Sequence, residues 1–281
     1  MKTDTHSKYP PMSSDLAQRA FLTIWAGLAQ WHQELVLVGG LVPKYICSHP
    51  PKESSMLHPV TLDVDIGIAF GVDGGQYGDL RSDLARQGFL PSSNPSRFER
   101  SIQGVTVPVD FLTEHPSGMA GSTQIAGITA NIMPGVERAL TLAQNVTACG
   151  VDLYDVEQTL TARVCAVGPF LALKLRAFYG RQAPKDAFDI FYTIKYYQGG
   201  SEAAMLAFAE EVRAGNRACG DALKALREHF SSEQHSAPVR AGHFLYEESN
   251  HSGDVRERRA LIAQEVAAIG KRMLAMCGIE K

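Results

Sequence analysis

The segment from Thr61 to Phe70 has the sequence TLDVDIGIAF and indicates the fold most clearly. Apolar residues occupy every second position from Leu62 to Ile68, which is the pattern of a β-strand with one buried face. Asp63 and Asp65 alternate with them, so both carboxylates project from the opposite face of the strand. The segment therefore predicts a strand that carries two acids on one side.

Similar patterns extend to both sides of this segment. Strands are predicted for residues 35–38, 97–102, 106–113, 128–133 and 160–167, and helices for residues 41–47, 77–87 and 136–144. A further helix, capped by Ser14 or Asp15, is predicted before the first strand. Pro108 predicts a sheet edge or the end of ladder pairing. The Pro- and Ser-rich stretch 48–59 and Gly74-Gly75 predict loops.

After Gly168-Pro169 the periodicity becomes helical. Helices are predicted at 169–181, 184–197, 201–213, 217–230 and 255–276, with a polar loop at 231–253. The predicted fold class is therefore mixed α+β, with an α/β core containing a mixed sheet at residues 14–166 and a helical region at 167–281.

Composition excludes several classes of protein. The chain has 281 residues and a formal net charge of −3, which argues against a protein that coats nucleic acid non-specifically. Five scattered cysteines predict reduced thiols and a cytoplasmic location. No apolar run is long enough for a transmembrane helix, and the first 15 residues lack the apolar core of a secretory signal. Neither a P-loop nor a Gly-x-Ser-x-Gly motif is present.

Asp63 and Asp65 are the first candidate metal ligands. Two acids at positions i and i+2 of a strand lie about 7 Å apart on one face, so both can reach hard cations between them. Mg²⁺, or Mn²⁺, is the expected ion, because such sites combine one or two carboxylates with water and substrate phosphates. Asp110, on the matching face of a later strand, is a candidate third ligand. The alternative is that Asp63 and Asp65 only line a solvated sheet face.

Gly39-Gly40 is a candidate phosphate-binding turn. It follows the predicted strand 35–38, and a glycine turn leaves backbone N–H groups open to close approach by a phosphate. Lys44, one turn further on, adds a positive charge. A simple tight turn is the alternative interpretation.

The segment from Lys174 to Ile190, KLRAFYGRQAPKDAFDI, is the second candidate motif. Five basic residues and no acid lie between Arg163 and Lys185, so a local basic patch is expected there. Pro184 suits the first turn of a helix, on which Asp186 and Asp189 follow. The alternative is an ordinary solvated helix face with an i,i+4 ion pair between Lys185 and Asp189.

The first two motifs resemble the signature of the nucleotidyltransferase superfamily. The matching residues are Gly39-Gly40, Asp63-Val64-Asp65 and Val109-Asp110-Phe111. The resemblance implies a nucleotidyltransferase-like core in which the glycines contact the phosphates of an NTP substrate and the acids hold Mg²⁺. In this chain 22 residues separate Gly40 from Asp63, more than is typical, and the stretch 48–59 accounts for the surplus as an insertion.

The Lys174–Ile190 segment resembles the second motif of AbiEii-type toxins, which include the MenT group. Eight positions agree over 17 residues: Lys174, Leu175, Ala177, Arg181, Lys185, Asp186, Asp189 and Ile190. The resemblance implies that Lys174 contacts the triphosphate and that Asp189 is an essential carboxylate, with Arg181, Lys185 and Asp186 in support. It also implies a toxin of a type IV-like toxin–antitoxin pair, which has a cognate antitoxin and modifies an RNA such as a tRNA 3′ end.

The expected function is two-metal-assisted transfer of NMP from an NTP to a hydroxyl acceptor, with release of pyrophosphate. Two alternatives stay open. One is the same chemistry on a small molecule or a protein, and the other is a non-catalytic binding module with this fold.

Overall fold

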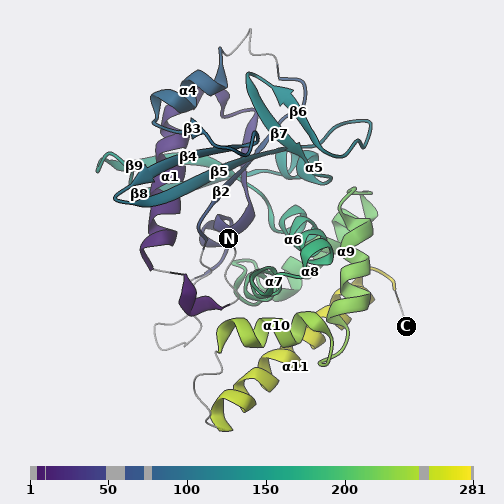
Figure 1. Ribbon diagram of the computed structural model, residues 1–281. Coiled ribbons are helices and arrows are strands. Elements are labelled where there is room, and N and C mark those ends of the chain that lie inside the picture. Colours follow the sequence, from purple (N-terminus) through teal and green to yellow (C-terminus); the bar gives the residue numbers. More distant parts are fainter. Residues whose placement is uncertain (1–4, 10, 49–60, 73–77, 247–252, 280–281) are drawn as a thin grey trace. The chain divides into compact units, whose positions relative to one another are not determined.

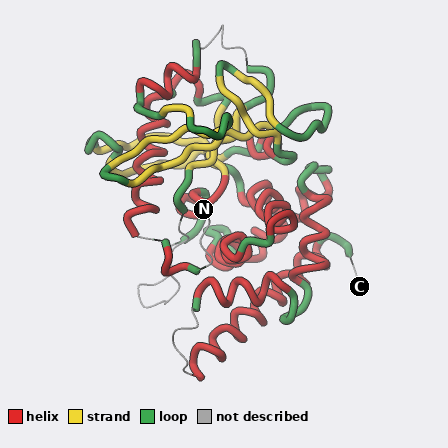
Figure 2. Tube along the Cα trace, in the orientation of Figure 1, coloured by secondary structure: helices red, strands yellow, loops and turns green. Residues whose placement is uncertain are grey.

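Figures 1 and 2 show a β-sheet built from the first half of the chain and a set of helices built from the second. The computed structural model describes residues 5–9, 11–48, 61–72, 78–246 and 253–279. These residues divide into two compact units. We call residues 11–45, 61–72 and 78–166 the sheet unit, and residues 5–9, 46–48, 167–246 and 253–279 the helical unit.

The sheet is mixed, as the sequence predicts. Its strands are β1 (Leu35–Val38), β2 (Val64–Ile68), β3 (Leu90–Pro91), β4 (Arg97–Ile102), β5 (Val105–Thr113), β6 (Ser122–Ile125), β7 (Ile128–Ile132), β8 (Gln144–Val151) and β9 (Glu157–Val164). The strand order is β3-β4-β5-β2-β1-β9-β8, and β7 joins β5 to β6. β2 pairs with β5 in parallel and with β1 antiparallel. This arrangement places the aspartate-bearing strands β2 and β5 side by side in the middle of the sheet.

Several α-helices belong wholly or partly to the sheet unit. They are α1 (Pro11–Gly27), α2 (Pro43–Ile46), α4 (Leu80–Arg86) and α5 (Val136–Thr141). α1 packs across the sheet and buries apolar side chains such as Phe21 and Trp25. α5 packs closely against Gly67 of β2 through its first residue, Val136. A Cβ added to Gly67 would lie only 3.2 Å from a methyl carbon of Val136. Because Gly67 has the same strand parity as Asp65, α5 covers the face that carries the aspartates.

Aliphatic and aromatic side chains together form the core of the helical unit. Its main elements are α6 (Val167–Arg181), α7 (Pro184–Tyr196), α8 (Ser201–Arg213), α9 (Cys219–Ala225), a π-helical turn (Leu226–Phe230), α10 (Ser236–Leu245) and α11 (Gly253–Met276). α6 packs against α7, α8 and α9, while α10 packs against α7 and α11. Cys47 forms a β-bridge with Tyr197, so residues 46–48 belong to this unit although they lie within the predicted core range 14–166.

Several predicted elements need correction. α1 begins at Pro11, so neither Ser14 nor Asp15 caps it; proline is well tolerated in a first helical turn. The predicted loop 231–253 contains α10, with the sequence SAPVRAGHFL. Its Pro and Gly are residues typical of loops, so the sequence pattern does not indicate a helix. β8 was not predicted, because Ala148 is its one buried residue and no apolar alternation marks it.

Pro108 lies in a central strand rather than at the sheet edge. β5 pairs with β4 along its first half, and its ladder with β2 begins at Val109. Pro108 therefore lies just outside the β2 ladder, which agrees with the predicted end of pairing. Residues 49–59 of the predicted loop 48–59, and the predicted break at Gly74-Gly75, lie outside the described residues.

Candidate functional site

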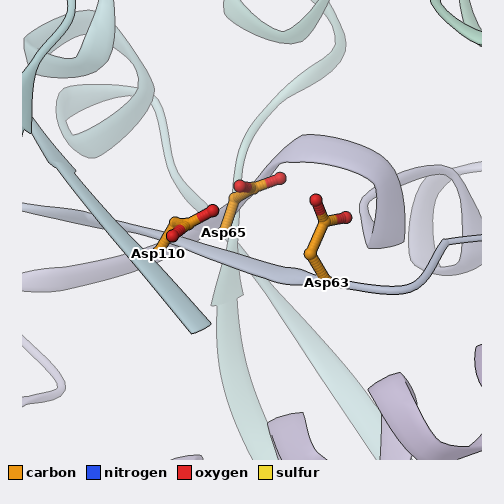
Figure 3. Close-up of side chains that lie close together, drawn as sticks. All are labelled: Asp63, Asp65 and Asp110. Atoms are coloured by element: carbon orange, nitrogen blue, oxygen red, sulfur yellow. The ribbon is translucent and has the colours of Figure 1, made fainter. Parts of the chain in front are cut away.

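Three aspartates converge on one face of the sheet (Figure 3). Asp65 of β2 is the register partner of Asp110 of β5, and Asp63 lies two residues earlier on the same face. Each contributes one carboxylate oxygen to a group whose members all lie within 4.8 Å of one another. All three residues are half-buried. The sequence-predicted ligands are thus brought together by the parallel pairing of β2 with β5.

Gly39 lies directly against Asp65. Val38 is the register partner of Asp65 in the β1–β2 pair, and Gly39 follows it with a φ of +74°, in the left-handed region that favours glycine. A Cβ at Gly39 would lie 1.8 Å from Oδ2 of Asp65. The backbone of the Gly39-Gly40 turn can therefore approach this carboxylate only because position 39 has no side chain.

Two further residues bind the aspartates, and sequence reasoning missed both. Thr61 Oγ1 donates a hydrogen bond of 2.7 Å to Oδ1 of Asp63. Arg97 of β4 binds both oxygens of Asp110, with Nε–Oδ1 and Nη2–Oδ2 distances of 2.8 and 2.6 Å. The hydrogen bonds to Asp110 raise the pKa of Arg97 above its usual range, with a smaller contribution from the charge of Asp63.

The hairpin between β4 and β5 contains a sequence signal that places Arg97 opposite Asp110. Gln103 and Gly104 both have positive φ and form a two-residue connection, which fixes the register of the two strands. Counting back from that turn pairs Arg97 with Asp110, as observed.

The donor set suits a hard divalent cation. Mg²⁺ and Mn²⁺ prefer carboxylate oxygens, and the three oxygens come from three separate side chains that are partly accessible. The close fit of Gly39 against Asp65 leaves backbone, rather than a side chain, beside that carboxylate. The three carboxylates therefore have the chemistry to hold a divalent cation, although both oxygens of Asp110 are engaged by Arg97.

Gly40 and Lys44 are the other predicted phosphate-binding residues in the sheet unit. Gly39–Leu41 form a 3₁₀ turn after β1, and Lys44 lies on the one-turn helix α2. The ammonium of Lys44 donates to the side-chain oxygen of Gln18 on α1. Burial lowers the pKa of Lys44, and the charge of Asp15 partly opposes that effect.

The residues of the second motif form a buried ion-pair cluster in the helical unit. Lys174 Nζ lies 2.6 Å from Oδ2 of Asp189 and 3.2 Å from Oδ1 of Asp186. Lys185 Nζ lies 2.6 Å from Oδ2 of Asp189. Arg181 completes the cluster through two hydrogen bonds of 2.6 and 2.8 Å to the carboxylate of Asp186.

This cluster links the second half of α6 to the first half of α7. Asp186 and Asp189 are fully buried, and Lys174 and Lys185 are 5% and 3% exposed. Burial acts to lower the pKa of Lys174, but the charges of Asp189 and Asp186 outweigh it and raise that pKa. Oδ1 of Asp189 is buried without a hydrogen-bond partner among the described residues. The i,i+4 pair between Lys185 and Asp189 is present, but it is buried rather than solvated.

The expected basic patch between Arg163 and Lys185 is largely neutralised within the protein, although the side chain of Arg181 is 46% exposed. Each of its five basic side chains binds another group of the protein. Besides the three in the cluster, Arg163 donates to backbone oxygens, including that of Leu140, and Arg176 lies 3.8 Å from Asp221. The alternative of an ion pair between Lys185 and Asp189 is therefore present in the structure, and Asp186 and Asp189 also neutralise Lys174 and Arg181.

Comparisons with known proteins leave the family open. The chain matches no protein-family model, and no curated protein matches it significantly. Within the described part of the chain, no helix combines the length and the apolar composition needed to cross a membrane.

Proposed function

We propose that this protein is a nucleotidyltransferase that moves an NMP group from an NTP to a hydroxyl acceptor and releases pyrophosphate. The convergence of Asp63, Asp65 and Asp110 to within 4.8 Å is the single observation that carries this proposal. Like charges at such distances repel one another unless cations neutralise them; Arg97 offsets part of this charge, and a bound divalent cation would offset more. This supports a metal centre.

The proposed reaction forms a bond between the acceptor oxygen and the α-phosphorus of the NTP and breaks the bond to the bridging oxygen of the pyrophosphate. Asp63 and Asp65 would hold Mg²⁺ or Mn²⁺, and Asp110 would act as a third ligand or as the base that takes the acceptor proton. When bound, the metal supplies charge stabilisation to the reacting phosphate. Thr61 would keep the carboxylate of Asp63 in a fixed orientation through its hydrogen bond, and Arg97 binds the carboxylate of Asp110.

Backbone and side-chain donors would bind the triphosphate. Gly39 and Gly40 would offer backbone N–H groups next to the aspartates, and Lys44 would add charge. The motif resemblance implies phosphate contacts by Lys174, Arg181 and Lys185 and a catalytic role for Asp189; in the structure these side chains bind within the ion-pair cluster of the helical unit, so the proposal does not use them. Positioning and electrostatics would supply most of the rate enhancement, because this chemistry asks little covalent work of the protein.

The acceptor class rests on the same resemblance. The agreement of Lys174–Ile190 with AbiEii- and MenT-type toxins supports a toxin that modifies RNA, such as a tRNA, and that has a cognate antitoxin. A cytoplasmic location fits that role and the scattered cysteines.

A labelling assay tests the proposal. Purified protein is incubated with each of the four α-³²P-NTPs, Mg²⁺ or Mn²⁺, and either total RNA or RNA-free extract. We expect label in RNA with the wild type and none with Asp65→Asn. Asp155→Asn, an exposed aspartate of the same unit, is the matched control and should label normally. Label in protein or small molecules would mean that one of these, rather than RNA, is the acceptor. No label with any acceptor would overturn the proposal.

A further inference from the structure

The carboxylate of Asp110 is already bound by a guanidinium. Arg97 engages both carboxylate oxygens of Asp110 at 2.8 and 2.6 Å, in the parallel-fork geometry that arginine and carboxylate favour. The two residues are register partners on neighbouring strands, so the backbone holds them opposite each other. Their side chains are 32% and 15% exposed, which leaves the pair within reach of solvent ions.

A bidentate contact leaves little of Asp110 for a metal. Both oxygens accept hydrogen bonds from Arg97, and a cation that binds either oxygen meets the positive charge of the guanidinium nearby. The charge of Asp63 also acts on Arg97, so this arginine lies in the electrostatic field of more than one candidate ligand.

We propose that Arg97 competes with the divalent cation for Asp110 and so sets the affinity of the metal site. While Arg97 holds Asp110, the cation binds through Asp63 and Asp65; release of Asp110 completes the three-carboxylate site. Arg97 is thus a positioning residue that acts through Asp110. This inference rests on the proposed function in one respect, since it takes the three aspartates as the metal centre.

The test is a Mn²⁺ titration of the full chain without nucleotide, followed by the electron paramagnetic resonance signal of free Mn²⁺. We expect Arg97→Gln to bind Mn²⁺ about tenfold more tightly than the wild type, because a competing charge is removed and Asp110 is released. Arg97→Lys keeps the charge but loses the fork, so its affinity should lie between the two. Arg81→Gln is the matched control: it removes an exposed charge from the same unit and should bind as the wild type does.

A double variant shows whether the effect passes through Asp110. In the Asp110→Asn background, Arg97→Gln should change Mn²⁺ affinity by less than about threefold. Equal or weaker Mn²⁺ binding by both Arg97→Gln and Arg97→Lys would overturn the inference and leave the proposed metal centre intact. Absence of Mn²⁺ binding in the wild type and in every variant would overturn both.

Discussion

The aspartate triad of the sheet unit and the ion-pair cluster of the helical unit use the same residue types in opposite ways. In the triad, three half-buried carboxylates lie within 4.8 Å of one another. In the cluster, two fully buried carboxylates are matched by the cations of Lys174, Lys185 and Arg181. Both groups of residues belong to the candidate motifs identified in the sequence.

Burial and charge balance explain what each arrangement can do. A buried carboxylate is costly unless cations and hydrogen bonds compensate it, and the cluster supplies these from the protein itself. The half-buried triad gathers negative charge where an ion from solution can still reach it. The triad is therefore suited to binding a ligand, whereas the cluster is primarily a connection between α6 and α7.

The largest expected effect is a loss of protein stability when the ion-pair cluster, rather than the aspartate triad, is disrupted. Asp189→Asn should lower the free energy of unfolding by about 3–5 kcal/mol, because Lys174 and Lys185 lose their shared buried partner. Asp65→Asn should change it by less than about 1 kcal/mol, since it relieves repulsion at a half-buried position. Urea unfolding of both variants measures the difference. Similar midpoints for Asp189→Asn and the wild type would remove the structural role assigned to the cluster.

A second comparison tests the close approach at the triad. Gly39→Ala places a Cβ against Asp65, whereas Gly118→Ala has nearly the same φ, +75°, with no atom near the added carbon. Each substitution should cost about 1–2 kcal/mol of stability through backbone strain. We expect Gly39→Ala also to lose nucleotide transfer and Mn²⁺ binding, and Gly118→Ala to keep both. Equal activity in the two variants would show that the fit of Gly39 against Asp65 is irrelevant to the site.

The cluster should also give the protein an alkaline signature. The pKa of Lys174 is raised in the folded state, so its contribution to stability is fully present below its unfolded value of 10.5 and is lost as pH rises toward the folded value. Above pH 10.5, the wild type should lose about 1.4 kcal/mol per pH unit relative to Lys174→Met. Urea titrations at pH 9, 10 and 11 measure this difference. A stability gap that stays constant up to pH 11 would contradict the raised pKa.

The smallest effect is expected outside the cluster. Arg176 lies in the same basic segment, but it and Asp221 are part-exposed and 3.8 Å apart. Arg176→Ala should cost less than about 0.5 kcal/mol and leave nucleotide transfer unchanged. A larger loss in urea unfolding would mean that the whole segment, rather than its buried members, stabilises the helical unit.

Local patterns predicted several strands of the sheet and the aspartates, but not β8. The alternation around Asp63 and Asp65, and again around Asp110, predicts which side chains share a face, whereas the parallel pairing of β2 with β5 is known from the structure. Arg97 needed one more step, the hairpin register. The mutual neutralisation of Lys174, Asp186 and Asp189 was beyond reach, because sequence spacing does not reveal how deeply two neighbouring helices bury the residues between them.

Pyrophosphate release tests the central claim most directly. The wild type and Asp65→Asn are compared with each of the four NTPs, total RNA and Mg²⁺, after urea unfolding has shown that both are equally folded. We predict release by the wild type with at least one NTP and a loss of about a thousandfold or more in Asp65→Asn, the scale expected when a group that stabilises charge in the transition state is removed. Equal rates in the two proteins would contradict the assignment of the triad as the site of chemistry.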